Sequence, residues 1–519
     1  MEDQYVMCVD IGTTGAKATI FDGVGRVMAS GYHEYICDFP RPGWVEQDAD
    51  FIIGKSMEAA RDALAKSGLN PQAVKAVSFS AQRCCTVFLD ASGRLIRPMI
   101  SWQDNRTAAE VEIIKKAVSP GDFYAVTAMP LGTTWMISKI IWVRNNEPEN
   151  WKKVKKIIQL HDYALIKWGA GEFLEDVSDT GFYGLWDPYK FEWNTKLLDI
   201  CGLDSSWLPK PVATGTSAGS LSAKAAELTG LTAGTPLCVG AGDQNSAALG
   251  AGVVDKGCMS ISLGTGGLAA VFLDEPFLDP AGMTMITNHA IYGKWQLEGL
   301  QAGAASVFRW FRDEIAVLEK EAAKASGRDA YELLNEMAAK VPAGSRGLVM
   351  LPYFASATTP RWNSSARGTI TGLTFAHDRN CLARAFMEGI TLEVKDMVKT
   401  LLGAGIQVDN IRILGGPTKS PLWNQMQADM YNRPVSTLVM TDAAVLGAGI
   451  AAGVGIGMYK SVKDAALSMV KADKVYEPVP ANVSVYDDLY GIYCKMYEGF
   501  QDKGVFDAVA ELQKKIGAV

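Results

Sequence analysis

The chain has 519 residues, of which 48% are hydrophobic and 21% charged, and its formal net charge is −7 at pH 7. This length is too great for one hydrophobic core, so we expect two large globular domains. The acidic balance and the lack of a Lys/Arg block argue against nucleic-acid binding. The first residues read as a strand, which predicts no signal peptide. The longest apolar run, 443–458, is rich in Gly and Ala, and it predicts a packed buried helix rather than a membrane span.

The cysteines and histidines exclude two classes of site. Nine cysteines lie scattered without Cys-x-x-Cys spacing, which predicts free thiols in a reducing cytoplasm. Four histidines lie far apart and form no ligand spacing, so a zinc site is not expected.

Residues 6–22 predict a β-hairpin, because two runs rich in β-branched residues flank a Gly-Thr-Thr-Gly turn. The turn offers backbone amides and the hydroxyls of Thr13 and Thr14. Asp10 and Lys17 stand on either side of it. Such a turn can donate hydrogen bonds to a polyphosphate, with a carboxylate nearby for a metal ion.

The same pattern occurs again near the middle of the chain. Residues 262–274 align with residues 10–22 without a gap, but Ser262 replaces Asp10 and Ala269 replaces Lys17. We therefore predict a duplicated fold in which each half contributes one phosphate-binding hairpin. The metal and charge chemistry is kept only in the first hairpin.

Polar side chains follow the strands predicted after the first hairpin. A strand over 25–34, a helix capped near Asp48 or Asp50 and a strand over 74–80 indicate an α/β half. Ligands of open α/β sheets bind at strand ends, where this sequence places Gln82, Arg83, Trp102, Gln103 and Asp104. These residue types bind the hydroxyl groups of a sugar or polyol. The alternative interpretation is that the segment is a surface loop with a packed tryptophan. Asp104 could then form a local ion pair with Arg106 rather than bind substrate.

A second informative segment follows a buried strand that ends in glycines, 237–242. Asp243 and Gln244 then open an alanine-rich helix. An acid at a helix start is often only a cap. Here it precedes the second hairpin by about twenty residues. A carboxylate between a phosphate site and a hydroxyl-binding pocket could deprotonate an attacking alcohol.

The second half repeats the α/β pattern. A strand from 412 leads to paired glycines, Gly415 and Gly416, which allow close approach of a flat or charged ligand. The tail beyond about 462 predicts mostly helix. Asp162, Asp176 and Asp179 fall in a polar region and are not assigned.

With these segments placed, the chain resembles the FGGY family of carbohydrate kinases, within the actin-like ATPase superfamily. Residues 10–15 look like the family's first phosphate motif, 263–267 the second and 414–417 the adenosine motif, while 242–244 resemble the segment that holds the catalytic base. The two family signatures are present with departures. Met136 stands where Pro, Ser or Thr is usual, and Cys381 replaces a polar residue.

The resemblance implies an α/β fold of two actin-like (ribonuclease H-like) domains with a cleft between them, which we place at 1–247 and 248–519. It implies ATP and Mg²⁺ as cofactors, with Asp243 as general base and Asp10 near the metal. The implied ATP-binding residues are Thr13, Thr14, Lys17, Gly264, Thr265, Gly266, Gly415, Gly416 and Ser420. The implied substrate-binding residues are Gln82, Arg83, Trp102, Asp104, Asp243 and Gln244.

The substrate is the open question. Xylulose kinases usually have Gln-Met-His-Gly where this chain has residues 82–85, and glycerol kinases have Gln-Arg-Glu. Gln82 and Arg83 match the latter, but Cys84 lacks its carboxylate. Segments 161–163 and 176–179 look more like pentulose kinases, so we expect a ketose such as xylulose, with glycerol or another polyol as the alternative.

A non-metabolic actin-like ATPase would share both hairpins, and it is the competing class; a dehydrogenase is a distant third. We expect a cytoplasmic enzyme of a small sugar or polyol, without nucleic-acid or membrane partners. The sequence leaves the oligomeric state open and allows a homodimer.

Overall fold

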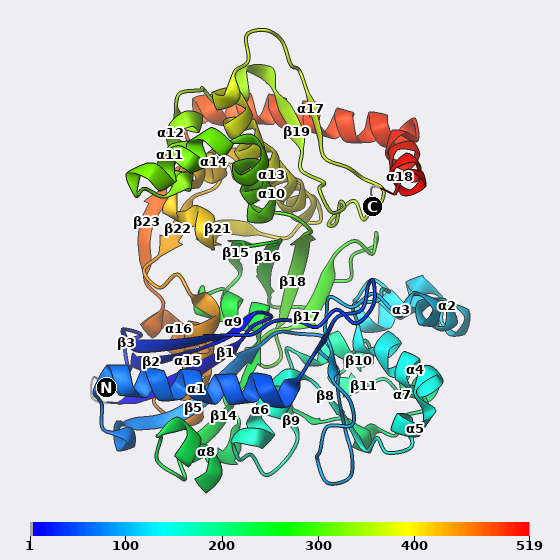
Figure 1. The fold of residues 1–519 in the computed structure, drawn as a ribbon, viewed down its shortest axis with the longest axis vertical. Helices are drawn as coiled ribbons and strands as arrows, with labels where there is room; N and C mark the ends of the chain where they lie inside the picture. The colour runs from blue at the N-terminus through cyan, green and yellow to red at the C-terminus, as the bar shows by residue number, and fades with distance from the viewer. Residues whose placement is uncertain (1–3, 518–519) are drawn as a thin grey trace. The chain divides into compact units, whose positions relative to one another are not determined.

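The computed structural model describes residues 4–517. The chain forms two compact units, and each is built from separate segments of the sequence (Figure 1). The first unit comprises Met1–Asp255, Phe272–Leu297 and Asp442–Lys471. The second unit comprises Lys256–Val271, Glu298–Thr441 and Ala472–Val519.

The first unit is organised around a six-stranded sheet in the order β13-β14-β5-β1-β2-β3. β1 pairs antiparallel with β2 and parallel with β5, which pairs parallel with β14. Parallel strands covered on both faces are almost wholly buried, as the buried run Val6–Val9 in β1 illustrates. The strands are β1 (Tyr5–Ile11), β2 (Gly15–Asp22), β3 (Val27–Glu34), β5 (Val74–Ala81), β13 (Ser217–Ser220) and β14 (Pro236–Gly242).

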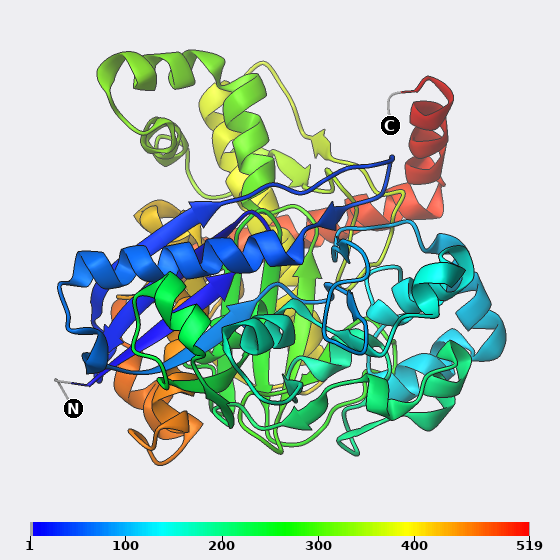
Figure 2. The same ribbon diagram turned by 60° about the horizontal axis from the view of Figure 1, so that its bottom comes forward.

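Helix α1 (Ala49–Ser67) covers β2 and β3, as Figure 2 shows. It begins where predicted, because the Asp48 carboxylate accepts a hydrogen bond from the Phe51 N–H at 3.1 Å. Its buried side chains, among them Ile52, Ile53 and Met57, face the sheet. The core of the unit therefore lies between α1 and the six strands.

The predicted glycine-rich helix is α15 (Ala443–Gly455), and it is buried as expected. It packs against α9 (Asp243–Gly250) and against β1, β5 and β14. A Cβ atom on Gly447 would overlap the Ser246 carbonyl oxygen, so the two helix backbones touch directly. Among the helices formed by residues 4–517, none combines the length and the hydropathy that a membrane-spanning segment needs.

The remaining elements of the first unit are short. Its helices are α2 (Ala108–Ala117), α3 (Pro120–Thr127), α4 (Met136–Asn146), α5 (Pro148–Trp151), α6 (Leu160–Trp168), α7 (Thr195–Cys201), α8 (Ala223–Thr229) and α16 (Val462–Met469). Its short strands are β4 (Glu46–Gln47), β6 (Val87–Leu89), β7 (Met99–Ile100), β8 (Lys156–Ile158), β9 (Leu174–Asp176), β10 (Trp186–Asp187), β11 (Glu192–Trp193), β12 (Lys210–Val212) and β17 (Met285–Asn288).

The second unit repeats the core pattern of the first. β15 (Gly257–Leu263) forms a hairpin with β16 (Gly267–Leu273) and pairs parallel with β21 (Val408–Leu414). In the same sheet, β22 (Val435–Leu438) lies beside β21, and β23 (Ala472–Tyr476) beside β22. Each unit thus holds a hairpin whose first strand has a parallel neighbour, as the repeated sequence pattern leads us to expect.

The second unit's longest helix, α13 (Arg379–Gly403), is mostly buried. The other elements are α10 (Ala305–Trp310), α11 (Val317–Ser326), α12 (Ala330–Ala339), α14 (Pro421–Tyr431), α17 (Pro480–Asp502), α18 (Val505–Lys515), β18 (Trp295–Gln301), β19 (Val349–Leu351) and β20 (Thr369–Thr371). The predicted α/β class is therefore confirmed. All nine cysteines of the chain are free thiols, as predicted.

Candidate active site

Three predicted functional positions lie at one edge of the first unit's sheet. Asp10 is near the end of β1, Arg83 follows the end of β5, and Asp243 follows β14. The three strands are parallel neighbours, and Ala81 of β5 is in register with both Ile11 and Gly242. Because the carboxyl ends of parallel strands meet at the same edge, the sheet gathers these side chains into one region.

The Asp10 carboxylate accepts a hydrogen bond from Ser80 Oγ at 2.8 Å. Burial, together with the negative charge of Asp442, raises the pKa of Asp10 to about 7. Across the hairpin, Lys17 is the register partner of Asp10, and its Nζ lies 2.7 Å from Asp442 Oδ2. Carboxylates that repel each other in a partly buried place are stabilised by a bound cation. The oxygen donor of Asp10 therefore fits Mg²⁺.

The turn of the first hairpin is held from several sides. The Thr13 carbonyl accepts a hydrogen bond from Gln47 Nε2 at 2.9 Å, and its hydroxyl accepts one from Trp102 Nε1 at 3.0 Å. Tyr35 donates its hydroxyl to the Gly12 carbonyl at 2.6 Å. Trp102, predicted to contact substrate, thus touches a residue predicted to contact phosphate.

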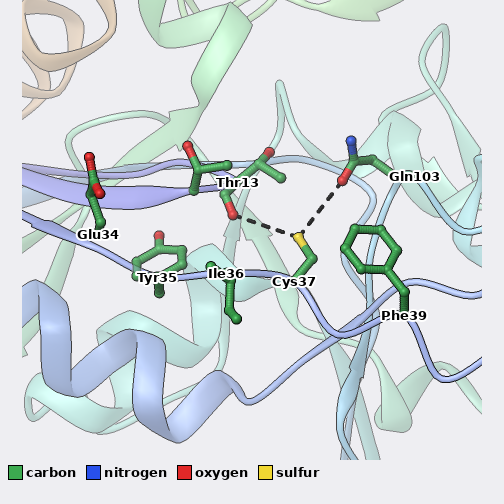
Figure 3. A pocket seen from close by; sticks show the side chains of 8 residues that line it. Thr13, Glu34, Tyr35, Ile36, Cys37, Phe39 and Gln103 are labelled. Atoms are coloured by element: carbon green, nitrogen blue, oxygen red, sulfur yellow. Dashed lines mark hydrogen bonds between the residues drawn. The ribbon is translucent and has the colours of Figure 1, made fainter.

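A pocket of about 560 Å³ opens beside this turn (Figure 3). Its lining residues are Thr13, Thr14, Glu34, Tyr35, Ile36, Cys37, Phe39 and Gln103. The Cys37 thiol lies within hydrogen-bonding distance of the Thr13 carbonyl, at 3.9 Å, and of Gln103 Oε1, at 3.8 Å. The pocket brings hydroxyl and amide groups together next to the predicted phosphate site.

Arg83 connects several parts of the candidate site. Its Nη1 donates to Asn245 Oδ1 at 2.9 Å, and its Nε lies 3.5 Å from Asp243 Oδ1. The guanidinium also stacks over the Phe182 ring at 4.0 Å. The Asp243 side chain is 29% exposed, so a substrate hydroxyl can reach it. Gln244 follows Asp243 in α9, and its backbone N–H donates to Asp243 Oδ1 at 2.7 Å.

Two other predicted substrate ligands are engaged in internal contacts. Gln82 is buried, and its Nε2 donates to Gln47 Oε1 at 2.9 Å. Asp104 is also buried, accepts hydrogen bonds from the Val45 N–H, and pairs with Arg106 at 2.7 Å. The ion pair that the sequence left open for Asp104 is therefore formed. Both side chains hold neighbouring loops in this structure.

The nucleotide-binding residues predicted in the second half gather within the second unit. Gly264 donates its N–H to the Gly266 carbonyl at 2.9 Å, and the Thr265 carbonyl accepts from Ser306 Oγ at 2.6 Å. The pairing of β15 with β21 places this turn next to Gly415. Gly415 has φ of 93°, and a Cβ there would overlap the Leu263 carbonyl oxygen, so only glycine fits.

The paired glycines of the second unit lead into a helix. Gly416 begins a short 3-10 turn that ends at Lys419. Ser420 caps α14 by accepting from the Trp423 N–H, and its hydroxyl donates to Asn335 Oδ1 at 2.9 Å. The predicted adenosine motif is therefore an ordered strand–turn–helix connection.

The first unit also contains a group of buried acids to which the sequence alone assigned no role. The Asp162 and Glu175 carboxyl groups share a hydrogen bond. Burial raises the pKa of both, so the pair retains a proton where a solvated carboxyl would lose it. Tyr183 donates its hydroxyl to both carboxylates at 3.2 Å. The pair is therefore built into the interior of the first unit.

His161 stands beside this pair, and the oxygens of Asp162 and Glu175 lie close enough to its ring for the three to surround a metal ion. The Gly240 N–H donates to His161 Nε2 at 3.1 Å, which leaves the ring proton on Nδ1. Burial also lowers the pKa of His161 to about 4. The nitrogen that faces the acids thus carries a proton and is a poor metal ligand.

Asp179 interacts electrostatically with both Glu175 and Arg83. It is almost fully buried, and within residues 4–517 neither of its carboxylate oxygens has a hydrogen-bond partner. A Cβ on Gly242 would lie 2.5 Å from Asp179 Oδ1 and 2.6 Å from Arg83 Cγ, so the absence of a side chain at Gly242 lets the two approach. The run of acids over 162–179 was the only sequence signal for this group.

Two family models match the chain. The N-terminal domain of the FGGY family of carbohydrate kinases matches residues 5–250, and its C-terminal domain matches residues 259–456. The chain belongs to the FGGY family of carbohydrate kinases. The predicted family and enzyme class are therefore confirmed, and sugar kinases of this family use ATP.

Individual FGGY relatives are similar over nearly the whole chain. A xylulose kinase of Bacillus subtilis is 27% identical over 500 residues, which cover 96% of this chain and 98% of that protein. An autoinducer-2 kinase of Salmonella choleraesuis is 32% identical over 491 residues, covering 93% and 92%. The crystal structure of ligand-bound xylulose kinase from Lactobacillus acidophilus has a TM-score of 0.88 and 25% identity, covering 96% and 98%.

Proposed function

We propose that this FGGY kinase transfers the γ-phosphate of ATP to a hydroxyl of a small ketose, xylulose or a related pentulose, with Asp243 as general base. The observation that carries the proposal is the placement of Asp243. Its partly exposed carboxylate follows β14, 3.5 Å from Arg83, at the sheet edge that also holds Asp10. A general base must be reachable by the attacking hydroxyl and must lie near the groups that bind the substrate and the phosphate.

Each residue then has a defined part in the transfer. The Asp243 carboxylate accepts the proton of the substrate hydroxyl while that oxygen attacks the γ-phosphorus, and the bond from phosphorus to the bridging oxygen of ADP breaks. The Arg83 guanidinium orients substrate oxygens next to Asp243. Asp10 would hold Mg²⁺, which when bound neutralises phosphate charge.

The remaining site residues bind the nucleotide. In the first unit, we assign Thr13 and Thr14 to the γ-phosphate and Lys17 to the phosphates that ATP and ADP share. In the second unit, we assign the turn Gly264–Gly266 to the β- and γ-phosphates and Gly415, Gly416 and Ser420 to the edge of the adenosine. Backbone N–H groups in such turns can donate hydrogen bonds to phosphate oxygens, because glycine has no side chain that would block their approach.

Cys84 supports a ketose over glycerol. It occupies the position where glycerol kinases carry the glutamate of Gln-Arg-Glu, and its side chain is buried. Its backbone N–H donates to Gln159 Oε1 at 2.8 Å, which ties this loop to the buried acid group. A thiol there cannot accept two hydroxyl hydrogen bonds as a carboxylate does.

Autoinducer-2 is the second candidate substrate. It is favoured by the 32% identity to an autoinducer-2 kinase, against 27% to a xylulose kinase. For either reaction we propose the cytoplasm as the compartment. The nine free thiols support this proposal, because the cytoplasm is a reducing environment.

An ATP-consumption assay with xylulose, ribulose, autoinducer-2 and glycerol tests the proposal. We expect the highest kcat/KM with xylulose or ribulose, and loss of turnover in Asp243→Asn. A preference for autoinducer-2 would replace the ketose assignment. ATP hydrolysis that does not depend on any of the four substrates would favour the non-metabolic ATPase class instead.

A further inference from the structure

An ion pair in the first unit joins two segments that are 425 positions apart in the sequence. Lys17 lies on β2, and Asp442 directly precedes α15. The Lys17 Nζ and Asp442 Oδ2 are 2.7 Å apart, and the two side chains are 34% and 28% exposed. Lys17 is also the register partner of Asp10, so the pair lies beside the predicted phosphate hairpin.

The Asp442 carboxylate is directed to Lys17 and not to the helix that follows it. Asp442 occupies the N-cap position of α15, but its side chain makes no capping hydrogen bond to the described backbone. Partly exposed ion pairs add little to folding stability. The main physical effect of the pair is therefore on where the Lys17 ammonium lies.

We propose that Asp442 is a positioning residue that acts through Lys17 in nucleotide binding. The inference rests on the proposed function, because that function assigns Lys17 to the phosphates. An ammonium group has three donors, and Asp442 takes one, which leaves two for phosphate oxygens. A free lysine side chain loses much rotamer entropy when it binds, and a lysine that is already held loses less.

The charge of Asp442 predicts the opposite effect if positioning is unimportant. A carboxylate near the phosphate site repels the polyphosphate, so its removal alone would tighten nucleotide binding. Positioning predicts weaker binding after the same change. The Asp442 charge also acts on Asp10, the proposed Mg²⁺ ligand, so the affinity for ADP is measured without Mg²⁺. The direction of the change in affinity then separates the two effects.

The test uses the full chain with Asp442→Asn and Asp442→Glu. For Asp442→Asn we expect a rise of about fivefold in KM for ATP and in the calorimetric Kd for ADP, with the KM for the sugar unchanged. Asp442→Glu keeps the carboxylate and should restore most of the affinity. Asp255→Asn is the matched control, because Asp255 forms a 2.6 Å ion pair with Lys463 in the same unit, and it should leave both constants unchanged.

Lys17→Met and the double variant complete a thermodynamic cycle. If Asp442 acts through Lys17, the double variant should bind ADP no more weakly than Lys17→Met alone. Unchanged or tighter ADP binding in Asp442→Asn, with weaker binding in Lys17→Met, would overturn the role of Asp442 and keep the phosphate site. Unchanged ADP binding in Lys17→Met would overturn the assignment of Lys17 as well.

Discussion

Arg83 Nε lies 3.5 Å from Asp243 Oδ1, although the two residues follow different strands and are 160 positions apart. The contact forms because β5 and β14 are parallel neighbours whose ends meet at one sheet edge. Arg83 is in turn fixed by Asn245 and by the Phe182 ring. We therefore propose that the pair presents a carboxylate and a guanidinium to the same substrate molecule.

The first prediction concerns the proposed base. Asp243→Asn keeps the size of the side chain but cannot accept a proton from the substrate, so we expect kcat to fall by about 10²–10⁴-fold. The substitution leaves the start of α9 in place, and the melting temperature should stay within a few degrees of the wild type. Steady-state kinetics and thermal melting measure both. A kcat near that of the wild type would remove Asp243 from the chemistry.

The second prediction concerns Arg83. Arg83→Lys keeps the charge but loses the planar group that reaches Asn245 and stacks on Phe182. We expect the KM for the sugar to rise by about tenfold, while the KM for ATP stays the same. Arg94→Lys, at an exposed position of the same unit, serves as the control. A change confined to the KM for ATP would contradict a role in sugar binding.

The third prediction concerns pH and magnesium. The pKa of Asp10 is raised to about 7, so its carboxylate is protonated at lower pH and then cannot bind a cation. The Mg²⁺ concentration needed for half-maximal activity should therefore rise as the pH falls from 8 to 6. Ser80→Ala removes the hydrogen bond to the charged form, which should move this rise to higher pH. A Mg²⁺ requirement that is the same at both pH values would count against Asp10 as the metal ligand.

The parts of the site that the sequence could predict depend on short stretches of chain. The Gly-Thr-Thr-Gly turn with Thr13 and the cap at Asp48 follow from local patterns of strands, turns and helix starts. The sequence could not link Asp442 to Lys17, because the ion pair depends on the folding of the distant segment Asp442–Lys471 into the first unit. Asp162, Asp176 and Asp179 could not be assigned a role from the sequence, because a polar stretch does not reveal that tertiary packing buries it.

The fourth prediction uses the buried acid pair. The folded state raises the pKa of Glu175, so it binds a proton more tightly than the unfolded chain does. The stabilisation is complete below the unfolded value of about 4.3 and is lost as the pH rises toward the folded pKa. Glu175→Gln keeps a donor for Asp162 at every pH. We therefore expect its free energy of unfolding to fall less between pH 5 and 9 than that of the wild type.

Chemical denaturation across this pH range measures the difference. Glu172→Gln, at an exposed position three residues earlier, is the control and should follow the wild type. If Glu175→Gln and the wild type show the same dependence on pH, the pair does not retain its proton in the folded protein.

The last prediction concerns the contact between α9 and α15. Gly447→Ala places a methyl group against the Ser246 carbonyl oxygen. This oxygen belongs to the backbone and cannot rotate away as a flexible side chain does, so the two helices must move apart. We expect a loss of about 1–3 kcal/mol in the free energy of unfolding. Gly54→Ala, at an exposed position of α1, is the control and should add about 0.5–1 kcal/mol, because alanine favours helix over glycine. Denaturant titration measures both, and equal gains from the two substitutions would show that the helix backbones do not touch.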